Sequence, residues 1–449
     1  MTRTEADVVV IGGGMAGLVA ATTLAAQGKD IVVLEAAERI GGRVESVRKG
    51  DYWLNVGTQF TEGTGTLIDK LDEHGIVRGT LAGKKIGLDL GDGEVLDTGN
   101  PVSLMLNAAM TMSDRIGLAK VGARIINGAV WLDPRFENTA LGRRYRAFLD
   151  KKTGDYLLGG VRSDVARAMV QAWSGQWMGC DPEETAAGQF VFSVGMAIAD
   201  PAKVPNFSLP EGGNQTLTDV LASDLGDRVR LGSTVRAVHW ADDSVTVHYA
   251  DADGVHELHA QRAVIAVPAD IAAALLPELP PSYRTALDQI SYGRYVIVGY
   301  FTEENGPARW DDFYGVSTPT RAFQAMFNHA AALRTGERRP GGALACFAGG
   351  SKADALMDLS DDEIVDRFNR DLLEVYPELE GKLGTPIVRK HHRVVPYWGP
   401  GGRATLPTLR EPLGPIHFAG DYLLDVPSLA DAAESGERAA QAIAAGLRP

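Results

Sequence analysis

The apolar and polar positions of the first 35 residues predict a strand, a helix and a second strand. Residues 8–11 form an uncharged run of the kind that a buried parallel strand carries. A glycine-rich turn follows, and then a helix rich in alanine and leucine. Residues 31–34 form a second apolar run. This order predicts a βαβ unit with a parallel sheet.

The turn between the first strand and the helix carries Gly12, Gly14 and Gly17 in the spacing GxGxxG. The first glycine permits a tight turn, the second lets the backbone approach a pyrophosphate, and the third lets the helix pack on the strand. Glu35 ends the second strand, where a carboxylate accepts hydrogen bonds from a ribose 2′-hydroxyl and repels a 2′-phosphate. The pattern predicts a dinucleotide site that disfavours an NADP-type ligand.

Residues 39–46, with the sequence RIGGRVES, form a second motif. Gly42 lets the backbone pass near the pyrophosphate, and Arg43 adds a fixed positive charge. The N-terminus of the first helix faces the same phosphates. Together the two motifs favour FAD over NAD.

Signals of this nucleotide-binding unit recur at three separated places, which predicts a discontinuous domain. We expect an α/β fold in which a Rossmann-like FAD-binding domain comprises residues 1–78, 206–282 and 411–449. An α+β substrate-binding domain is expected from residues 79–205 and 283–410, because the chain is too long for one compact core.

The two insertions differ in pattern. Apolar periodicity at residues 105–126 and 165–177 predicts that the first insertion is mostly helical. The second alternates strands, at residues 295–301 and 343–347, with a helix at residues 361–376.

Composition limits the partners of this chain of 449 residues. Hydrophobic residues make up 45% and charged residues 23%, as in an ordinary globular protein. The formal net charge of −14 argues against nucleic acid and anionic membrane surfaces as partners, although a local basic patch stays compatible with it. Cys180 and Cys346 lack a CxxC spacing, so we predict inert packing residues in a reducing cytoplasm and no metal site.

Residues 8–26 carry no charge, which raises the alternative of a signal peptide or a membrane helix. Glu5 and Asp7 stand where a signal peptide carries basic residues, and three glycines interrupt the run. The run is also fully explained by a strand and its crossover helix. We therefore expect a cytoplasmic protein without a transmembrane segment.

Segments near both ends and in the middle of the chain resemble those of the flavin-containing amine oxidase superfamily, including its desaturase and protoporphyrinogen-oxidase relatives. They are residues 12–35, 39–46, 212–217 and 418–421, and the last is followed by SGERAA at residues 435–440. This order and spacing span nearly the whole chain. The resemblance implies FAD held mostly by backbone groups.

The resemblance also implies roles for individual residues. Val235 would flank the adenine, residues 57–60 would lie against the isoalloxazine, and Asp421 would lie near the ribityl and pyrophosphate. The final helix, beginning near Ser428 and Leu429, would direct its N-terminus at the flavin N1–C2=O edge, where reduced flavin carries negative charge. As an alternative, Asp421 caps that helix. The predicted FAD-binding residues are Gly12, Gly14, Met15, Ala16, Gly17, Glu35, Ala36, Gly41, Gly42, Arg43, Gly57, Thr58, Gln59, Phe60, Val235, Gly420, Asp421, Ser428 and Leu429.

Three departures from the family bear on the reaction. Many amine oxidases carry a lysine on the strand that crosses the flavin, whereas the aligned positions here hold Val296 or Ile297. One position of their paired aromatics falls at Ser428. The cysteine that attaches flavin covalently in some relatives has no counterpart after Cys346, so we expect non-covalent FAD.

Aromatic and histidine residues outside the motifs are weaker candidates. Tyr397 and Trp398, just before the last FAD segment, are candidate walls of the substrate site, with core packing as the alternative. His391 and His392 stand between Lys390 and Arg393, which favours a solvated or strand-surface role.

A pair of tryptophans and the segment before the final helix are also informative. Trp173 and Trp177, at i,i+4 spacing, are predicted to lie in a helical core. Residues 421–429 resemble the desaturase and protoporphyrinogen-oxidase branch more than the amine oxidases.

Three functions follow as hypotheses. The first is a FAD-dependent oxidoreductase that transfers a hydride from a substrate C–H to flavin N5 and dehydrogenates a largely apolar small organic molecule. The alternative is an amine oxidase that forms an imine and releases hydrogen peroxide. The third is a non-catalytic, FAD-bound scaffold. Oxygen or another acceptor would reoxidise the flavin.

Overall fold

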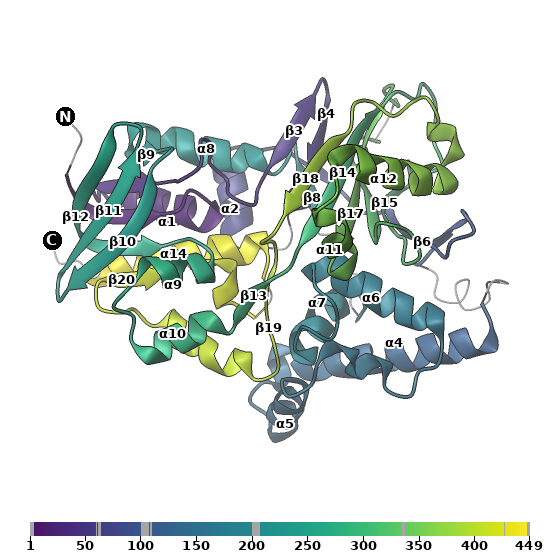
Figure 1. The fold of residues 1–449 in the computed structure, drawn as a ribbon, viewed down its shortest axis with the longest axis horizontal. Helices are drawn as coiled ribbons and strands as arrows, with labels where there is room; N and C mark the ends of the chain where they lie inside the picture. The colour runs from purple at the N-terminus through teal and green to yellow at the C-terminus, as the bar shows by residue number, and fades with distance from the viewer. Residues whose placement is uncertain are drawn as a thin grey trace.

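The computed structural model describes residues 4–59, 61, 64–99, 107, 110–199, 207–334, 337–425 and 427–446. Two seven-stranded sheets form its framework. In Figure 1 the first sheet lies on the left, the second at the upper right, and a group of helices at the lower right.

The first sheet is built around the apolar run at residues 8–11. Its five parallel strands are, in spatial order, β20 (Ile416–Phe418), β12 (Gly254–Ile265), β1 (Glu5–Ile11), β2 (Ile31–Leu34) and β9 (Val229–Arg230). An antiparallel pair extends the sheet from β12, namely β10 (Thr234–Ala241) and β11 (Ser244–Asp251). Strands from three separate stretches therefore share one sheet, which confirms the discontinuous fold. The domain boundaries themselves stay a prediction.

Helices cover both faces of this sheet, which explains its uninterrupted apolar strands. Successive side chains of β1 point to opposite faces, so Val8 and Val10 pack in one core and Val9 and Ile11 in another. The first core includes residues of α1 (Met15–Ala26), α2 (Thr66–Glu73), α8 (Gln215–Leu225) and α14 (Leu429–Gly446). The second includes residues of α9 (Ala269–Leu275), α10 (Pro281–Asp288) and α13 (Leu406–Arg410).

The second sheet has one face packed against helices and one face turned toward the first sheet. Its strands are, in spatial order, β18 (Ile387–His391), β14 (Tyr295–Thr302), β17 (Gly342–Gly349), β16 (Ala325–Asn328), β15 (Phe313–Ser317), β6 (Lys85–Asp89) and β7 (Val95–Asp97). One face packs with α11 (Ser351–Met357) and α12 (Asp361–Val375). The other face packs with Trp53, Leu54 and Val56, at and just after β4 (Tyr52–Asn55).

Four longer helices form a bundle with its own core: α4 (Met112–Leu132), α5 (Ala140–Leu149), α6 (Asp164–Met178) and α7 (Ala187–Ala199). Three short ladders connect the parts of the chain. They pair β3 (Ser46–Lys49) with β4, β5 (Arg78–Thr80) with β8 (Ser208–Pro210), and β13 (Ile290–Tyr292) with β19 (Pro396–Trp398).

The first insertion differs from its mostly helical prediction at its beginning. Residues Lys85–Asp89 and Val95–Asp97 are strands of the second sheet, because β6 pairs in parallel with β15. Within the predicted helix at residues 105–126, the structure describes α4 from Met112 onward, where Thr111 and Asp114 form a capping box, and residues 105, 106, 108 and 109 lie outside the described residues. None of the helices in the described ranges is long and apolar enough to cross a bilayer.

Candidate functional site

A cavity of about 820 Å³ lies between the first sheet and the second. Its lining comes from the carboxyl ends of β1, β2 and β12, from the beginnings of α1 and α14, and from β14, β16, β17 and β18. Ligands of open α/β sheets bind at this end of the strands. The cavity therefore has a nucleotide end, at the first sheet, and a substrate end, at the second.

The glycine turn leaves open space at the nucleotide end. Gly12 has a φ of +110°, and a Cβ on Gly17 would lie 2.0 Å from the Gly12 carbonyl oxygen, so both glycines are required by the turn itself. A Cβ on Gly14 would meet no atom within 4 Å. Gly14 also begins α1 without a side-chain cap, which leaves backbone N–H groups for an anion. This free space is where a pyrophosphate would fit.

Glu35 holds the turn and faces the same end of the cavity. One carboxylate oxygen accepts a hydrogen bond from the Gly13 N–H at 2.6 Å, and the other accepts from Ala37 N–H at 2.8 Å. Each oxygen keeps a further lone pair, which a ribose hydroxyl can donate to. The position at the end of β2 agrees with the predicted ribose contact.

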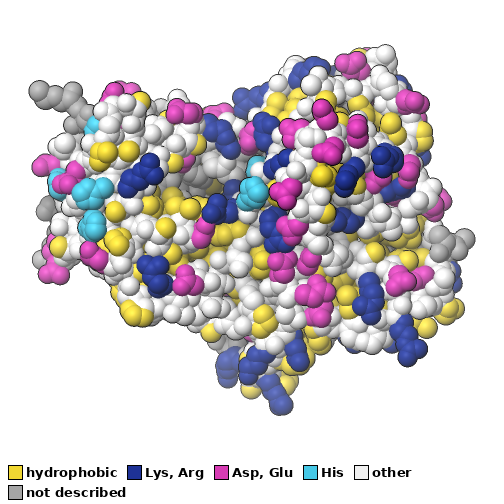
Figure 2. Space-filling view, in the orientation of Figure 1, with side chains coloured by type: hydrophobic (Ala, Val, Ile, Leu, Met, Phe, Trp, Pro, Cys, Tyr) yellow, Lys and Arg dark blue, Asp and Glu magenta, His cyan; other side chains and the backbone are white. Residues whose placement is uncertain are grey.

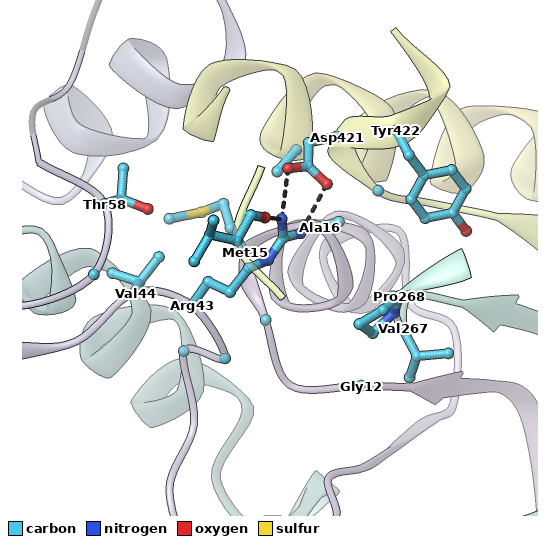
Figure 3. A pocket seen from close by; sticks show the side chains of 18 of the residues that line it. Gly12, Met15, Ala16, Arg43, Val44, Thr58, Val267, Pro268, Asp421 and Tyr422 are labelled. Carbon is cyan, nitrogen blue, oxygen red and sulfur yellow. Dashed lines mark hydrogen bonds and ion pairs between the residues drawn. The ribbon is translucent and has the colours of Figure 1, made fainter. Parts of the chain in front are cut away.

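Arg43 and Asp421 form a two-point ion pair beside the turn (Figure 3). The nitrogen–oxygen distances are 2.8 and 2.7 Å. Burial alone would lower the pKa of Arg43, but the charge of Asp421 raises it above its ordinary value. Both carboxylate oxygens of Asp421 therefore accept hydrogen bonds from Arg43. Ser428 caps α14, because its Oγ accepts a hydrogen bond from the Asp431 N–H at 3.1 Å.

The segment predicted to face the isoalloxazine is held in place by hydrogen bonds. Gln59 donates to the carbonyl oxygens of Asn55 and Gly57 at 3.0 and 2.7 Å, and Asn214 donates to the Thr58 carbonyl oxygen at 2.7 Å. Among the described residues, the Gln59 Oε1 atom is buried without a hydrogen-bond partner. An unpaired buried acceptor beside a cavity is a place where a ligand donor is expected.

The residues at this end fit FAD. Open space over the glycines, uncapped N–H groups and the unpaired Gln59 Oε1 supply what a pyrophosphate and a flavin require. The cavity volume lies within the usual range of ligand sites. Seventeen of the predicted FAD-binding residues line the cavity, and their contact with FAD stays a prediction: Gly12, Gly14, Met15, Ala16, Glu35, Ala36, Gly41, Gly42, Arg43, Gly57, Thr58, Gln59, Val235, Gly420, Asp421, Ser428 and Leu429. Gly17 packs behind the turn, and Phe60 lies outside the described residues.

The substrate end is mostly aromatic. Tyr295, Phe347 and Phe327 stand on three strands of the second sheet, with consecutive ring centroids 5.8 and 5.3 Å apart and nearly perpendicular rings. The Tyr295 hydroxyl donates to the Gln176 carbonyl oxygen at 2.7 Å, so it is already occupied. Trp177 adds a further aromatic wall from α6. These edge-to-face contacts make a stiff apolar compartment.

His391 is the one imidazole among the described lining residues. Its Nε2 lies 2.8 Å from the Val56 carbonyl oxygen, which can only accept, so Nε2 carries the hydrogen and Nδ1 of the neutral ring is an acceptor. Burial lowers the pKa of His391 below its ordinary value, against the raising effect of its hydrogen bond and of Glu45. The ring is therefore neutral at neutral pH. His392 is exposed, as the predicted solvated or strand-surface role requires, whereas His391 stands on strand β18, is partly buried and lines the cavity.

The two candidate substrate walls, Tyr397 and Trp398, do not line the cavity. Tyr397 packs in the helical core with its hydroxyl donating to Glu184 at 3.0 Å, and Trp398 packs in the core of the first sheet. Packing therefore explains their burial. Trp173 and Trp177 both pack against the helical core, as predicted, and Trp177 also lines the cavity. Trp177 stands about one helical turn further along α6 than Trp173 and reaches the cavity.

The alternation of side chains along β14 shows which of Val296 and Ile297 stands on the face where amine oxidases carry the lysine. Val296 packs on the helix-covered face, and Ile297 packs on the face toward the first sheet, fully buried. No lysine stands among the lining residues that the structure describes. Neither Cys180 nor Cys346 lines the cavity, and burial raises the pKa of both thiols. Neither is placed for a covalent flavin link.

Comparison with known proteins agrees with this geometry. The family model for flavin-containing amine oxidoreductases matches residues 15–444. The chain is 26% identical to AofH of Mycobacterium tuberculosis, whose name places it among the flavin-containing monoamine oxidases, over 98% of this chain and 97% of that protein. It is 27% identical to putrescine oxidase of Kocuria rosea over 55% of this chain and 52% of the other.

Solved structures show the same fold. Cyclohexylamine oxidase from Brevibacterium oxydans superposes with a TM-score of 0.80 at 22% identity, covering 98% of this chain and 99% of that chain. Putrescine oxidase with bound putrescine gives a TM-score of 0.79 at 21% identity, covering 99% and 100%.

Proposed function

The chain belongs to the family of flavin-containing amine oxidoreductases and is an FAD-dependent enzyme, and from this premise we propose that it oxidises an amine. The proposed substrate carries one amino group on a largely apolar or aromatic carbon skeleton. This combines the apolar substrate expected from the sequence with the amine chemistry of the family.

The composition of the substrate end carries the proposal. Its described walls are aromatic and aliphatic, with Gln176, Ser193 and His391 as the polar side chains. The carboxylates among the described lining residues are Glu35, which holds the glycine turn, and Asp421, which is paired with Arg43. A diamine would therefore leave its second ammonium without a partner in an apolar compartment, at a high desolvation cost.

His391 has the geometry to take a proton from the substrate. An amine enters mostly as an ammonium ion, and hydride loss from the carbon next to nitrogen requires the neutral amine. The Nδ1 lone pair of His391 can accept the proton, while the bond from Nε2 to Val56 fixes the ring. Bound FAD supplies the hydride acceptor at N5. The aromatic walls exclude water and orient the substrate carbon.

Desaturation of a C–C bond in an apolar molecule is the second candidate. The buried Ile297 in place of a lysine, and Ser428 in place of an aromatic, are the observations that favour it. The third hypothesis, a scaffold without activity, is dropped because the family consists of oxidoreductases.

Anaerobic bleaching of the flavin bands tests the proposal. The panel comprises straight-chain monoamines, cyclohexylamine, phenylethylamine, putrescine, amino acids, a polyene and a porphyrinogen. We expect bleaching by monoamines, faster as the apolar group grows, and none by putrescine. Bleaching by the polyene or the porphyrinogen alone would replace the proposal with desaturation. Peroxide release in air would identify oxygen as the acceptor, and cell fractionation would test the predicted cytoplasmic location.

A further inference from the structure

The outer face of the helical bundle combines exposed apolar residues with exposed lysines and arginines. On α4, six residues at helical spacing are exposed and lie on one face. They are Met112, Ile116, Ala119, Ala123, Ile126 and Val130. The side chains of Met112 and Ile126 are 65% and 51% exposed, in a molecule that buries most of its large apolar residues. No charged residue interrupts this face.

The neighbouring helix continues this apolar face. Leu141 and Phe148 of α5 are 62% and 39% exposed. Between them in the helix, Tyr145 accepts a hydrogen bond from Asn127 of α4 at 2.7 Å. That bond places the exposed side of α5 beside the C-terminal half of the α4 face. We call the exposed apolar residues of both helices, with the basic residues around them, the α4–α5 surface.

The charge of this part of the chain opposes that of the whole. Residues 111–152 hold nine lysines and arginines against four aspartates and glutamates, a formal charge of +5 in a chain of −14. Lys120, Arg143, Arg144, Lys151 and Lys152 are exposed. Within this stretch the ion pairs to described residues are the contact of Arg135 with Asp133 at 2.9 Å and a longer one, 3.9 Å, from Arg403 to Asp150. Figure 2 shows the dark-blue side chains gathered at the lower edge of the molecule.

We propose that the α4–α5 surface docks on an anionic lipid bilayer, with α4 lying parallel to the membrane. Exposed apolar residues beside lysines and arginines are the features of a helix that lies in the membrane interface. A second copy of the chain fits the surface less well, because a symmetric pair would bring +5 against +5. The overall charge of −14 does not oppose docking, since charges beyond a Debye length, about 8 Å, are screened.

Docking would place the cavity close to the membrane. α6 and α7, which pack against α4 in the bundle core, supply Gln176, Trp177 and Ser193 to the substrate end. An apolar substrate that partitions into a bilayer would then reach the enzyme from the face that carries α4. The inference does not depend on whether the substrate is an amine.

Vesicle flotation of the purified, FAD-loaded protein tests this inference. We expect it to float with vesicles of phosphatidylcholine and phosphatidylglycerol, and to lose most binding at high salt or with phosphatidylcholine alone. The double variant Arg143→Glu/Arg144→Glu should lower the partition coefficient about tenfold or more. Ile126→Ser/Val130→Ser should lower it about fivefold by removing buried apolar area.

Matched controls separate this surface from general charge and hydrophobicity. Arg367→Glu/Arg370→Glu changes two exposed arginines of α12, and Val255→Ser removes a valine that is 81% exposed in the first sheet. Both should float like the wild type. Absence of flotation, or equal loss in all variants, would overturn the inference. So would a dimer in sedimentation that Ile126→Ser/Val130→Ser converts to a monomer without changing flotation.

Discussion

The two ends of the cavity are built in opposite ways. At the nucleotide end, the shape comes from backbone, because Gly12 permits the tight turn and Gly14 carries no Cβ into the open space beside it. At the substrate end, the shape comes from side chains, with Tyr295, Phe347 and others contributed by separate strands and helices.

The difference decides how each end tolerates change. A backbone cradle depends on one short stretch of chain and fails when a single Cβ enters it. A wall of side chains from many elements can be altered one residue at a time while the framework persists. This explains how one family keeps its cofactor site while this chain departs from the usual amine oxidase pattern at Ile297 and Ser428.

The largest effect is expected from Gly14→Val at the nucleotide end. The backbone of Gly14, with φ −80° and ψ 179°, is one that valine adopts, and the new side chain would fill the open space. We therefore expect a folded protein with FAD affinity lowered by about two orders of magnitude or more. Flavin absorbance and circular dichroism measure the two outcomes.

Gly17→Val provides the contrast, because its Cβ would collide with the Gly12 carbonyl oxygen. That variant should lose the fold as well as the cofactor. Stoichiometric FAD in the Gly14→Val protein would contradict the assignment of this turn to the pyrophosphate.

His391→Asn should produce the next largest effect, at the substrate end. We expect kcat/KM for the best amine to fall about 100-fold with unchanged FAD content, since asparagine cannot take a proton. In the wild type, kcat/KM should fall as the pH drops through the lowered pKa of His391, below 6.5, because protonation occupies Nδ1. In the variant, kcat/KM should not show this fall at low pH. His392→Asn, at the exposed neighbour, is the control and should match the wild type in both respects.

Asp421→Ala tests the link between the nucleotide end and the substrate end of the cavity. Arg43 makes this link, because it pairs with Asp421 and also donates to the Val394 carbonyl oxygen beside the substrate end. The Asp421 side chain is 9% exposed and that of Arg43 is 35% exposed. We expect the free energy of unfolding of the FAD-free protein to fall by about 2 kcal/mol, less than for a fully buried pair.

A double-mutant cycle with Arg43→Met measures the coupling between the two side chains. Asp51→Ala breaks a pair whose side chains are 65% and 66% exposed, and should cost about 0.5 kcal/mol or less. Equal losses for Asp421→Ala and Asp51→Ala would show that the Arg43 pair has no special role.

The last prediction concerns the free energy of unfolding at low pH. His329 is fully buried in the described structure with neither ring nitrogen hydrogen-bonded, and burial lowers its pKa from 6.5 to about 3. Below pH 6.5 the unfolded chain binds a proton that the folded one excludes. The free energy of unfolding should therefore fall with pH by about 1.4 kcal/mol per unit until the folded pKa is reached.

His329→Leu should flatten this dependence, as measured by urea unfolding between pH 6.5 and pH 4. His392→Gln, at an exposed position, should leave the slope unchanged. His417, in the first sheet, has a pKa lowered by burial to about 4, and the pKa of His391 is lowered as well, so both would contribute to the remaining slope. An unchanged slope in His329→Leu would show that unfolding at low pH begins elsewhere.

The fold at the nucleotide end could be predicted because its information is contiguous. The apolar run at residues 8–11, the GxGxxG turn and the acid at Glu35 each act over a few residues, and local backbone geometry follows from them directly. Local sequence patterns carry no signal for the ion pair of Arg43 with Asp421, since it joins positions that are 378 residues apart.

The substrate end was decided by tertiary structure. In β18, Lys390 extends to the Leu359 carbonyl oxygen, while His391 faces the cavity, because adjacent strand residues point to opposite sides. The charged neighbours of His391 in sequence therefore concealed its environment. Likewise, Trp177 and Trp398 have similar aromatic side chains, and only the packing of α6 and β19 determines which one meets the cavity.

The sequence by itself determined the cofactor, because a backbone cradle for a pyrophosphate needs glycines at fixed spacing within one turn. Only the tertiary structure decided which side chains meet the substrate, because strand pairing, helix rotation and long-range ion pairs bring together residues whose distance in sequence carries no signal.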